Sequence, residues 1–271
     1  MQLGTPELQA LGRFVRSRRE LASASSYQEL PSRRRHVNHL TQSELAELVG
    51  VSTAVISQIE QARYPNLNNA VLLKVSLALR LSPQQDIYLR GLGVPRFNSD
   101  RSKQPLPAWL SASLPSIHHP VVVLNPCYDI LLFNDKAKSL FGAYLSKFLR
   151  NRNVADTVFG EPELKRFFTP WSEYAASMVS GLKMSFSLFP DFRDQIEAVA
   201  GRVCATDETF RELWNKADPL VPPTIEKVFN HPSLGELQVY QILTDLVEAK
   251  WLTKIEFIPA NEETAAKMRD M

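Results

Sequence analysis

Residues 41–63 read TQSELAELVGVSTAVISQIEQAR, and this stretch decides the fold of the first third of the chain. Thr41 and Glu44 have the spacing of a capping box, in which the two residues satisfy the first free backbone N–H groups of a helix. Gly50 permits the left-handed conformation that ends many helices, and Ser52 is a typical N-cap for the next helix. The pattern therefore predicts two short helices joined by a tight turn.

The second of these helices has two faces of different character. Ile56 and Ile59 fall on its apolar side, and Ala46 of the first helix is small enough to allow a close approach. The opposite side remains free, with side chains that reach base edges or meet a thymine methyl group. The predicted DNA-reading residues on and beside this face are Ser52, Thr53, Ala54, Val55, Ser57 and Gln58. A small helical bundle that makes protein contacts is the alternative interpretation of the same pattern.

This stretch resembles the helix-turn-helix of phage repressors and Xre-type regulators. In that family the glutamine that opens the first motif helix binds a phosphate, which implies this role for Gln42. The family also pairs an arginine with the glutamate that ends the recognition helix, and Arg19 and Glu60 hold those places. Dimers of such proteins read half-sites about one helical turn apart. The resemblance therefore implies a homodimer on a pseudo-palindromic operator in double-stranded DNA.

Basic residues are concentrated in the first third of the chain. Residues 1–93 carry 11 lysines and arginines against 7 aspartates and glutamates, whereas the remainder carries 20 against 22. This asymmetry favours contact with a polyanion through the first part alone. The chain has no apolar run of the roughly 18 to 20 residues that span a bilayer, and its start lacks the apolar core of a secretory signal. We therefore expect a cytoplasmic protein with no membrane partner.

Proline and polar residues separate two predicted domains. A helical pattern ends near Gly93, and residues 94–115 show no apolar period, which is typical of a linker. We predict an all-α domain of five helices over residues 1–93 and an α+β domain over residues 116–271. In the second domain two strands, several helices and three late strands follow one another, which predicts one five-stranded antiparallel sheet.

The expected elements can be assigned to residue ranges. The helices of the first domain are expected at 6–21, 41–50, 53–62, 69–79 and 83–92. In the fourth of these, Leu73, Leu77 and Ala78 are expected to face inward. The strands of the second domain are expected at 121–124, 128–133, 224–229, 234–243 and 251–258, with helices at 135–141, 161–182, 192–203 and 207–216.

Aromatic side chains crowd the middle of the second domain. They are numerous enough to line an apolar cavity between the sheet and the helices, where ligands of this architecture bind. Each single ring is also explained as ordinary core. The predicted ligand pocket consists of Phe133, Phe167, Phe168, Trp171, Phe186, Phe210 and Trp214.

No catalytic or metal-binding pattern accompanies these aromatics. His118 and His119 are adjacent and face different ways, and no third ligand lies at zinc spacing. Cys127 and Cys204 are too isolated for a disulfide framework, so we expect free, buried thiols. We expect no enzymatic activity, no metal and no cofactor, a bound fatty acid excepted.

The second domain resembles the ligand-binding domain of MmyB-like regulators, which has a PAS-like fold. The matching stretches, in family order, are VLNPCYDILLFN at 123–134, AKSLFG at 137–142, FRELW at 210–214 and HPSLGEL at 231–237. The resemblance implies a transcription regulator that senses an apolar small molecule, and fatty acids are implied for some members. The alternative is a regulator whose C-terminal domain is a ligand-free dimerisation module.

Overall fold

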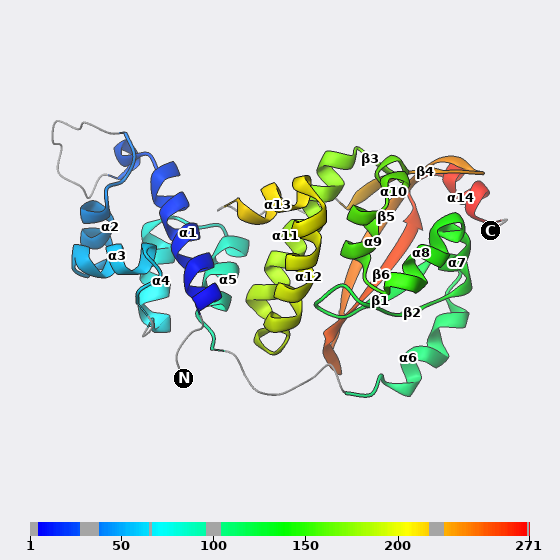
Figure 1. The fold of residues 1–271 in the computed structure, drawn as a ribbon, viewed down its shortest axis with the longest axis horizontal. Helices are drawn as coiled ribbons and strands as arrows, with labels where there is room; N and C mark the ends of the chain where they lie inside the picture. Colours follow the sequence, from blue (N-terminus) through cyan, green and yellow to red (C-terminus); the bar gives the residue numbers. More distant parts are fainter. Residues whose placement is uncertain (1–4, 28–37, 65–66, 96–103, 217–224, 270) are drawn as a thin grey trace. The chain divides into compact units, whose positions relative to one another are not determined.

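The computed structural model describes residues 5–27, 38–64, 67–95, 104–216, 225–269 and 271. The chain divides into two compact units, as the sequence predicts, and each is described by itself. The first is built mainly from Met1–Ser99 and the second from most of the remaining chain (Figure 1). Among the described helices, none combines the length and the apolar character that crossing a bilayer requires.

The first unit is helical. Its helices are α1 (Thr5–Leu21), α2 (Gln42–Val49), α3 (Thr53–Glu60), α4 (Asn69–Ala78) and α5 (Pro83–Leu92), with a short 3-10 turn at Ala24–Ser26. They enclose a core whose fully buried members include Leu11, Phe14, Leu45, Ile56, Leu72 and Leu89. Each of the five helices was predicted, and their ends differ little from the expected ones.

The predicted inward face of α4 is wrong. Leu73 and Leu77 are 47% and 69% exposed, and Ala78 is only half-buried, whereas Leu72 and Val75 are fully buried. Apolar residues occur on nearly every side of α4, so periodicity alone does not determine which of them face the core. Packing against α2 and α5 determines the face instead.

Helix α1 crosses the end of α3 at Gly12. A Cβ atom added at Gly12 would lie 2.6 Å from the carbonyl oxygen of Ile59 and 2.9 Å from that of Glu60. Both distances are shorter than real Cβ contacts, and the facing atoms belong to the backbone. The glycine therefore sets how closely α3 packs against α1.

Gly12→Ala is expected to destabilise the first unit by about 1–2 kcal/mol, because overpacking outweighs the better helix propensity of alanine. Hydrogen exchange in peptides that cover α1 and α3 measures this loss in the full chain. Gly201→Ala is the control, since an added Cβ atom at Gly201 has no neighbour within 4 Å among the described residues. Equal protection of α1 and α3 in wild type and Gly12→Ala would contradict the close packing.

The second unit contains one six-stranded antiparallel sheet with the strand order β2-β1-β6-β5-β4-β3 (Figure 1). Its strands are β1 (Val121–Leu124), β2 (Ile130–Phe133), β3 (Phe168–Thr169), β4 (Glu226–His231), β5 (Gly235–Leu246) and β6 (Ala249–Pro259). The hairpin of β1 and β2 and the three late strands were predicted, although residue 224 lies outside the described residues.

The prediction of five strands is wrong, and the sixth strand is β3. The single helix predicted over residues 161–182 is interrupted by this short strand, which pairs with β4. Pro170 explains the interruption, because proline has no backbone N–H and disfavours a helical conformation in the residue before it. Thr169 is accordingly extended, and a new helix begins at Trp171.

Helices precede, separate and follow these strands in the sequence. They are α6 (Ala108–Ser113), α7 (Asp135–Leu140), α8 (Leu145–Asn151), α9 (Val154–Gly160), α10 (Pro162–Phe167), α11 (Trp171–Leu188), α12 (Arg193–Thr206), α13 (Glu208–Asn215) and α14 (Glu262–Arg269). Short 3-10 turns occur at Leu114–Ser116, Gly142–Tyr144 and Pro190–Phe192. Leu110 and Leu114 are buried, so the last part of the segment expected as a linker is folded; residues 96–103 of that segment lie outside the described residues.

Candidate DNA-reading face and ligand cavity

Helices α2 and α3 and the turn between them form the candidate nucleic-acid interface. Thr41 caps α2, because its Oγ1 accepts a hydrogen bond from the Glu44 N–H at 3.2 Å and its own N–H donates to Glu44 Oε2 at 2.8 Å. Gly50 has a φ angle of 74° and ends α2, and Ser52 is the N-cap of α3. The capping box and the turn are therefore confirmed.

The outer side of α3 is not covered by the packing of its own unit. Ile56 and Ile59 are buried beneath it and attach the helix to the core. Among the predicted DNA-reading residues near α3, the exposed ones are Ser52, Thr53, Ala54 and Gln58, and the half-buried ones are Val55 and Ser57. A row of short and amide-bearing side chains is therefore available to a partner.

A buried polar network attaches the end of α3 to α1 and α2. Arg19 donates to Glu60 Oε1 at 2.6 Å, to Glu60 Oε2 at 3.0 Å and to the Leu40 carbonyl oxygen at 2.8 Å. The side chains of Arg19 and Glu60 are only 7% and 3% exposed. The pairing that the family resemblance implied is confirmed.

Gln42 belongs to the same network. Its Nε2 donates to Glu60 Oε2 at 2.8 Å, and its side chain is half-buried at the start of α2. This contact fixes the glutamine at the N-terminal end of the helix, where backbone N–H groups favour an anion. Its phosphate-binding role remains a prediction.

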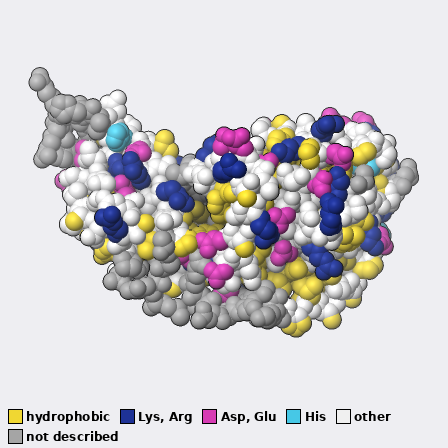
Figure 2. Space-filling model, viewed as in Figure 1, with side chains coloured by type: hydrophobic (Ala, Val, Ile, Leu, Met, Phe, Trp, Pro, Cys, Tyr) yellow, Lys and Arg dark blue, Asp and Glu magenta, His cyan; other side chains and the backbone are white. Residues whose placement is uncertain are grey.

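Charges on the second unit are largely arranged in pairs. Lys147 contacts Glu161 at 2.9 Å and Glu163 at 2.7 Å, and Arg202 contacts Asp156 at 2.6 Å. Figure 2 shows basic and acidic side chains interspersed on the visible face of the molecule. On that face, the described residues of the second unit form no broad basic surface of the kind that a DNA backbone selects.

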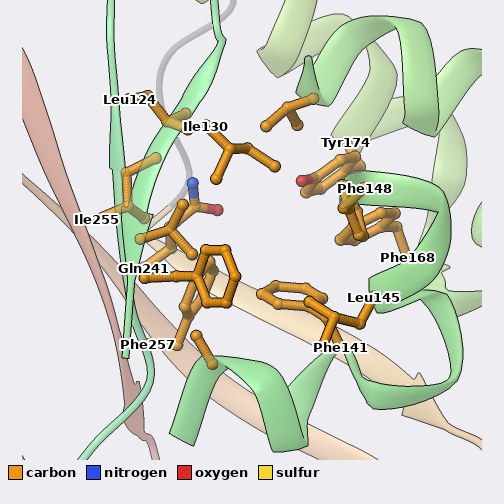
Figure 3. Close-up of a pocket in the computed structure, with 14 residues that line it drawn as sticks. Leu124, Ile130, Phe141, Leu145, Phe148, Phe168, Tyr174, Gln241, Ile255 and Phe257 are labelled. Carbon is orange, nitrogen blue, oxygen red and sulfur yellow. The ribbon is translucent and has the colours of Figure 1, made fainter. Parts of the chain in front are cut away.

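An apolar cavity lies between one face of the sheet and helices α7, α8, α9 and α11 of the second unit (Figure 3). Its volume is about 60 Å³. The sheet wall includes Val122, Leu124, Ile130, Ile255 and Phe257, and the helical wall includes Phe141, Leu145 and Phe148.

The strand register brings the sheet wall together from distant parts of the sequence. Val122 pairs with Ile255 across β1 and β6, and Phe257 pairs with Gln241 across β6 and β5. Side chains at directly opposed positions project to the same face of a sheet. From the helices, Phe141 approaches Phe257 edge-on, with ring centroids 5.6 Å apart.

Two polar side chains occur among the described residues that line the cavity, Gln241 and Tyr174. Gln241 Oε1 is buried and has no hydrogen-bond partner among the described residues. Burial, and then the nearby Tyr128 phenol, raises the pKa of Tyr174 above its ordinary value, so its hydroxyl stays protonated. The polar ends of both side chains point into the cavity (Figure 3).

Two of the predicted pocket residues, Phe133 and Phe168, line this cavity. The structure places the others outside its lining. Phe167 stacks on Phe229 with centroids 5.0 Å apart, and Phe186 is 5% exposed near the end of α11.

A second aromatic group holds the remaining predicted pocket residues. Phe159 meets Trp171 at 5.2 Å and Phe210 at 5.0 Å, and Phe210 in turn stacks on Trp214 at 5.8 Å. Gln241 was not among the predicted pocket residues. The signal that identifies it is its place in β5, where Leu237 and Val239 face the core at the two preceding alternate positions.

The histidines and cysteines of the second unit are the remaining candidates for metal ligands or nucleophiles. In the described part of the chain, no group of three or more His, Cys, Asp or Glu side chains could hold a metal ion. His119 Nε2 instead lies 2.6 Å from Glu256 Oε2. Both cysteines are free; Cys127 is buried and Cys204 is half-buried. Burial, with a further contribution from Asp129, raises the pKa of the Cys127 thiol to about 12.

Two family models match this sequence. A helix-turn-helix model matches residues 38–85, which contain α2 to α4, and the model of the MmyB-like transcription regulator ligand binding domain matches residues 110–271. No curated protein is significantly similar to the chain. Both resemblances inferred from the sequence are confirmed. The chain therefore belongs to the family of the MmyB-like transcription regulator ligand binding domain, with a helix-turn-helix preceding that domain.

Proposed function

We propose that this protein is a cytoplasmic, DNA-binding transcription regulator whose C-terminal domain senses an apolar small molecule. The uncovered outer side of α3 carries the first half of the proposal. The cavity of the second unit, which we interpret as a PAS-like pocket, supports the second half.

In this proposal α3 lies in the major groove. Thr53 and Ala54 are short, so the start of the helix approaches the base edges, and the alanine methyl group suits a thymine methyl. Gln58 lies about one turn further along and has the bidentate amide that recognises adenine. Gln42 and Ser52, at the starts of α2 and α3, are suited to phosphate contacts that fix the register.

We further propose that two chains bind together as a homodimer. Helix-turn-helix proteins read two half-sites about one helical turn apart, which gives the operator a pseudo-palindromic sequence. Ligand binding in the second unit and DNA binding in the first are then thermodynamically coupled, and the coupling is reciprocal.

The cavity favours an uncharged, mainly apolar ligand, because a charged group buried there would need an oppositely charged partner. A volume of about 60 Å³ is small for a ligand site. A fatty acid of twelve or more carbons therefore enters only in part unless the helices separate from the sheet. The unpartnered amide oxygen of Gln241 favours a ligand site over a ligand-free dimerisation module with a solid core.

Selection from a pool of random duplexes of about 30 base pairs, with the full chain as bait, tests the DNA-binding half. Fluorescence anisotropy at about 150 mM salt then compares the selected duplex with a scrambled one. We expect about 1,000-fold tighter binding to the selected duplex, with two chains bound. Equal affinity for both duplexes would mean that the protein binds DNA only through attraction to the phosphates. This result would refute sequence-specific regulation.

A further inference from the structure

The two polar side chains in the cavity restrict the chemistry of its ligand, and this argument rests on the proposed sensing function. Gln241 reaches the cavity from the sheet and Tyr174 from α11 (Figure 3). Among the described residues that line the cavity, none carries a charge. A ligand group that contacts both Gln241 and Tyr174 is therefore expected to be polar and neutral.

Gln241 supplies an unused acceptor. Its position opposite Phe257 directs it to the helix-covered face, where its Oε1 is buried without a partner. A buried acceptor that has lost its hydrogen bond to water is unfavourable until a donor reaches it. A ligand that donates a hydrogen bond to Oε1 removes this cost. A ligand without a hydrogen-bond donor leaves Oε1 without a partner.

Tyr174 supplies a rigid donor. Its ring stacks on Phe168 with centroids 3.7 Å apart and planes only 9° from parallel. Lys227 Nζ lies 5.7 Å from the centroid of the same ring and is not among the residues that line the cavity. The nearby cation therefore contacts the aromatic ring, and the cavity itself offers a carboxylate only neutral partners.

We infer that the cavity binds a small, uncharged molecule that carries a hydroxyl group on an apolar body, with the hydroxyl hydrogen donated to Gln241 Oε1. The ligand oxygen is the acceptor that suits the Tyr174 hydroxyl. At about 60 Å³, the cavity favours a ligand whose apolar body is small. Carboxylates are disfavoured, because they have no hydrogen for Gln241 and no cation in the wall to offset their burial.

Three matched probes test this inference on the full chain by ligand-observed nuclear magnetic resonance. 1-Pentanol and 1-methoxybutane have the same atoms, but the ether lacks the hydroxyl hydrogen, and pentanoate carries a charge. We expect 1-pentanol to bind about tenfold more tightly than either of the other two, which corresponds to one buried hydrogen bond.

Gln241→Leu is expected to remove the preference for the alcohol, because the affinity for 1-pentanol falls about tenfold while that for the ether does not fall. Gln238→Leu changes an exposed glutamine of the same strand and keeps the wild-type preference. Tyr174→Phe keeps the ring on Phe168 and is a second, independent variant in case Gln241→Leu fails to fold. It is expected to weaken binding of both the alcohol and the ether, since each carries an acceptor oxygen.

The outcomes separate this inference from the proposed function. Equal binding of alcohol and ether, tighter binding of pentanoate, or an unchanged preference in Gln241→Leu would overturn the hydroxyl-specific site and leave a sensing cavity. Pentanoate binding that depends on Gln241 would also overturn it, because the amide would then donate through its Nε2 to a carboxylate. Failure of all three probes to bind would overturn the inference that a small hydroxyl compound enters this cavity, and would leave the proposed sensing of a larger apolar ligand in place.

Discussion

Ala54→Glu is expected to abolish sequence-specific DNA binding and to leave the fold intact. Ala54 is the second residue of α3 and is exposed, so a larger side chain meets no neighbour within its unit. On DNA the added carboxylate would face phosphates and acceptor-rich base edges, and like-charge contacts of this kind cost several kcal/mol. The dissociation constant for the selected duplex is expected to rise by about 100-fold or more.

Ala70→Glu is the matched control for this variant. Ala70 is the second residue of α4 and is also exposed. A glutamate in the first turn of a helix interacts favourably with its N-terminus, so both variants are expected to fold. Anisotropy on the same duplex at the same salt concentration compares them, and an equal loss of affinity in the two variants would contradict a specific role for α3.

Arg19→Met is expected to lower the free energy of opening of the first unit by about 3–5 kcal/mol. The substitution leaves the Glu60 carboxylate, which is 3% exposed, without its cation, and removes the donor to the Leu40 carbonyl oxygen. Removal of one partner of a buried ion pair has costs of this size because the other charge stays buried. Hydrogen exchange in peptides that cover α1 and α3 measures the loss in the full chain.

Two further variants test whether the loss of stability comes from breaking the buried ion pair or from replacing any arginine of α1. Arg16 pairs with Glu20 at 2.8 Å, but its side chain is 65% exposed, so Arg16→Met is expected to change the exchange little. The double change Arg19→Met with Glu60→Met removes both charges and is expected to recover much of the stability. If Arg16→Met and Arg19→Met behaved alike, the buried network would not fix α3.

Local signals explain why the first unit could be predicted well from the sequence. Thr41 and Ser82 both form capping boxes, and Gly50 ends α2 in the left-handed conformation, so helix ends are encoded by residues close together in the chain. The face of α4 could not be predicted in this way. Leu73 and Leu72 are neighbours in sequence and equally apolar, and only the packing of α2 and α5 distinguishes them.

The second unit depends more strongly on contacts between distant residues. Helices α8 and α9 have about two turns each, too few for an apolar period to emerge, and they were therefore not predicted. The cavity wall needs the register of β5 on β6, which places Gln241 opposite Phe257. The aromatic residues indicated a cavity, but the sequence could not tell which rings line it and which form ordinary core.

Site-specific photo-crosslinking tests the central claim, that the outer side of α3 contacts duplex DNA, most directly. A photoreactive phenylalanine derivative replaces Gln58 in one sample and Gln84 of α5 in another, since both glutamines are exposed. We predict crosslinks to the selected duplex from position 58 and none from position 84. Crosslinks from position 84 with none from position 58 would contradict the account, because DNA would then contact another face of the unit.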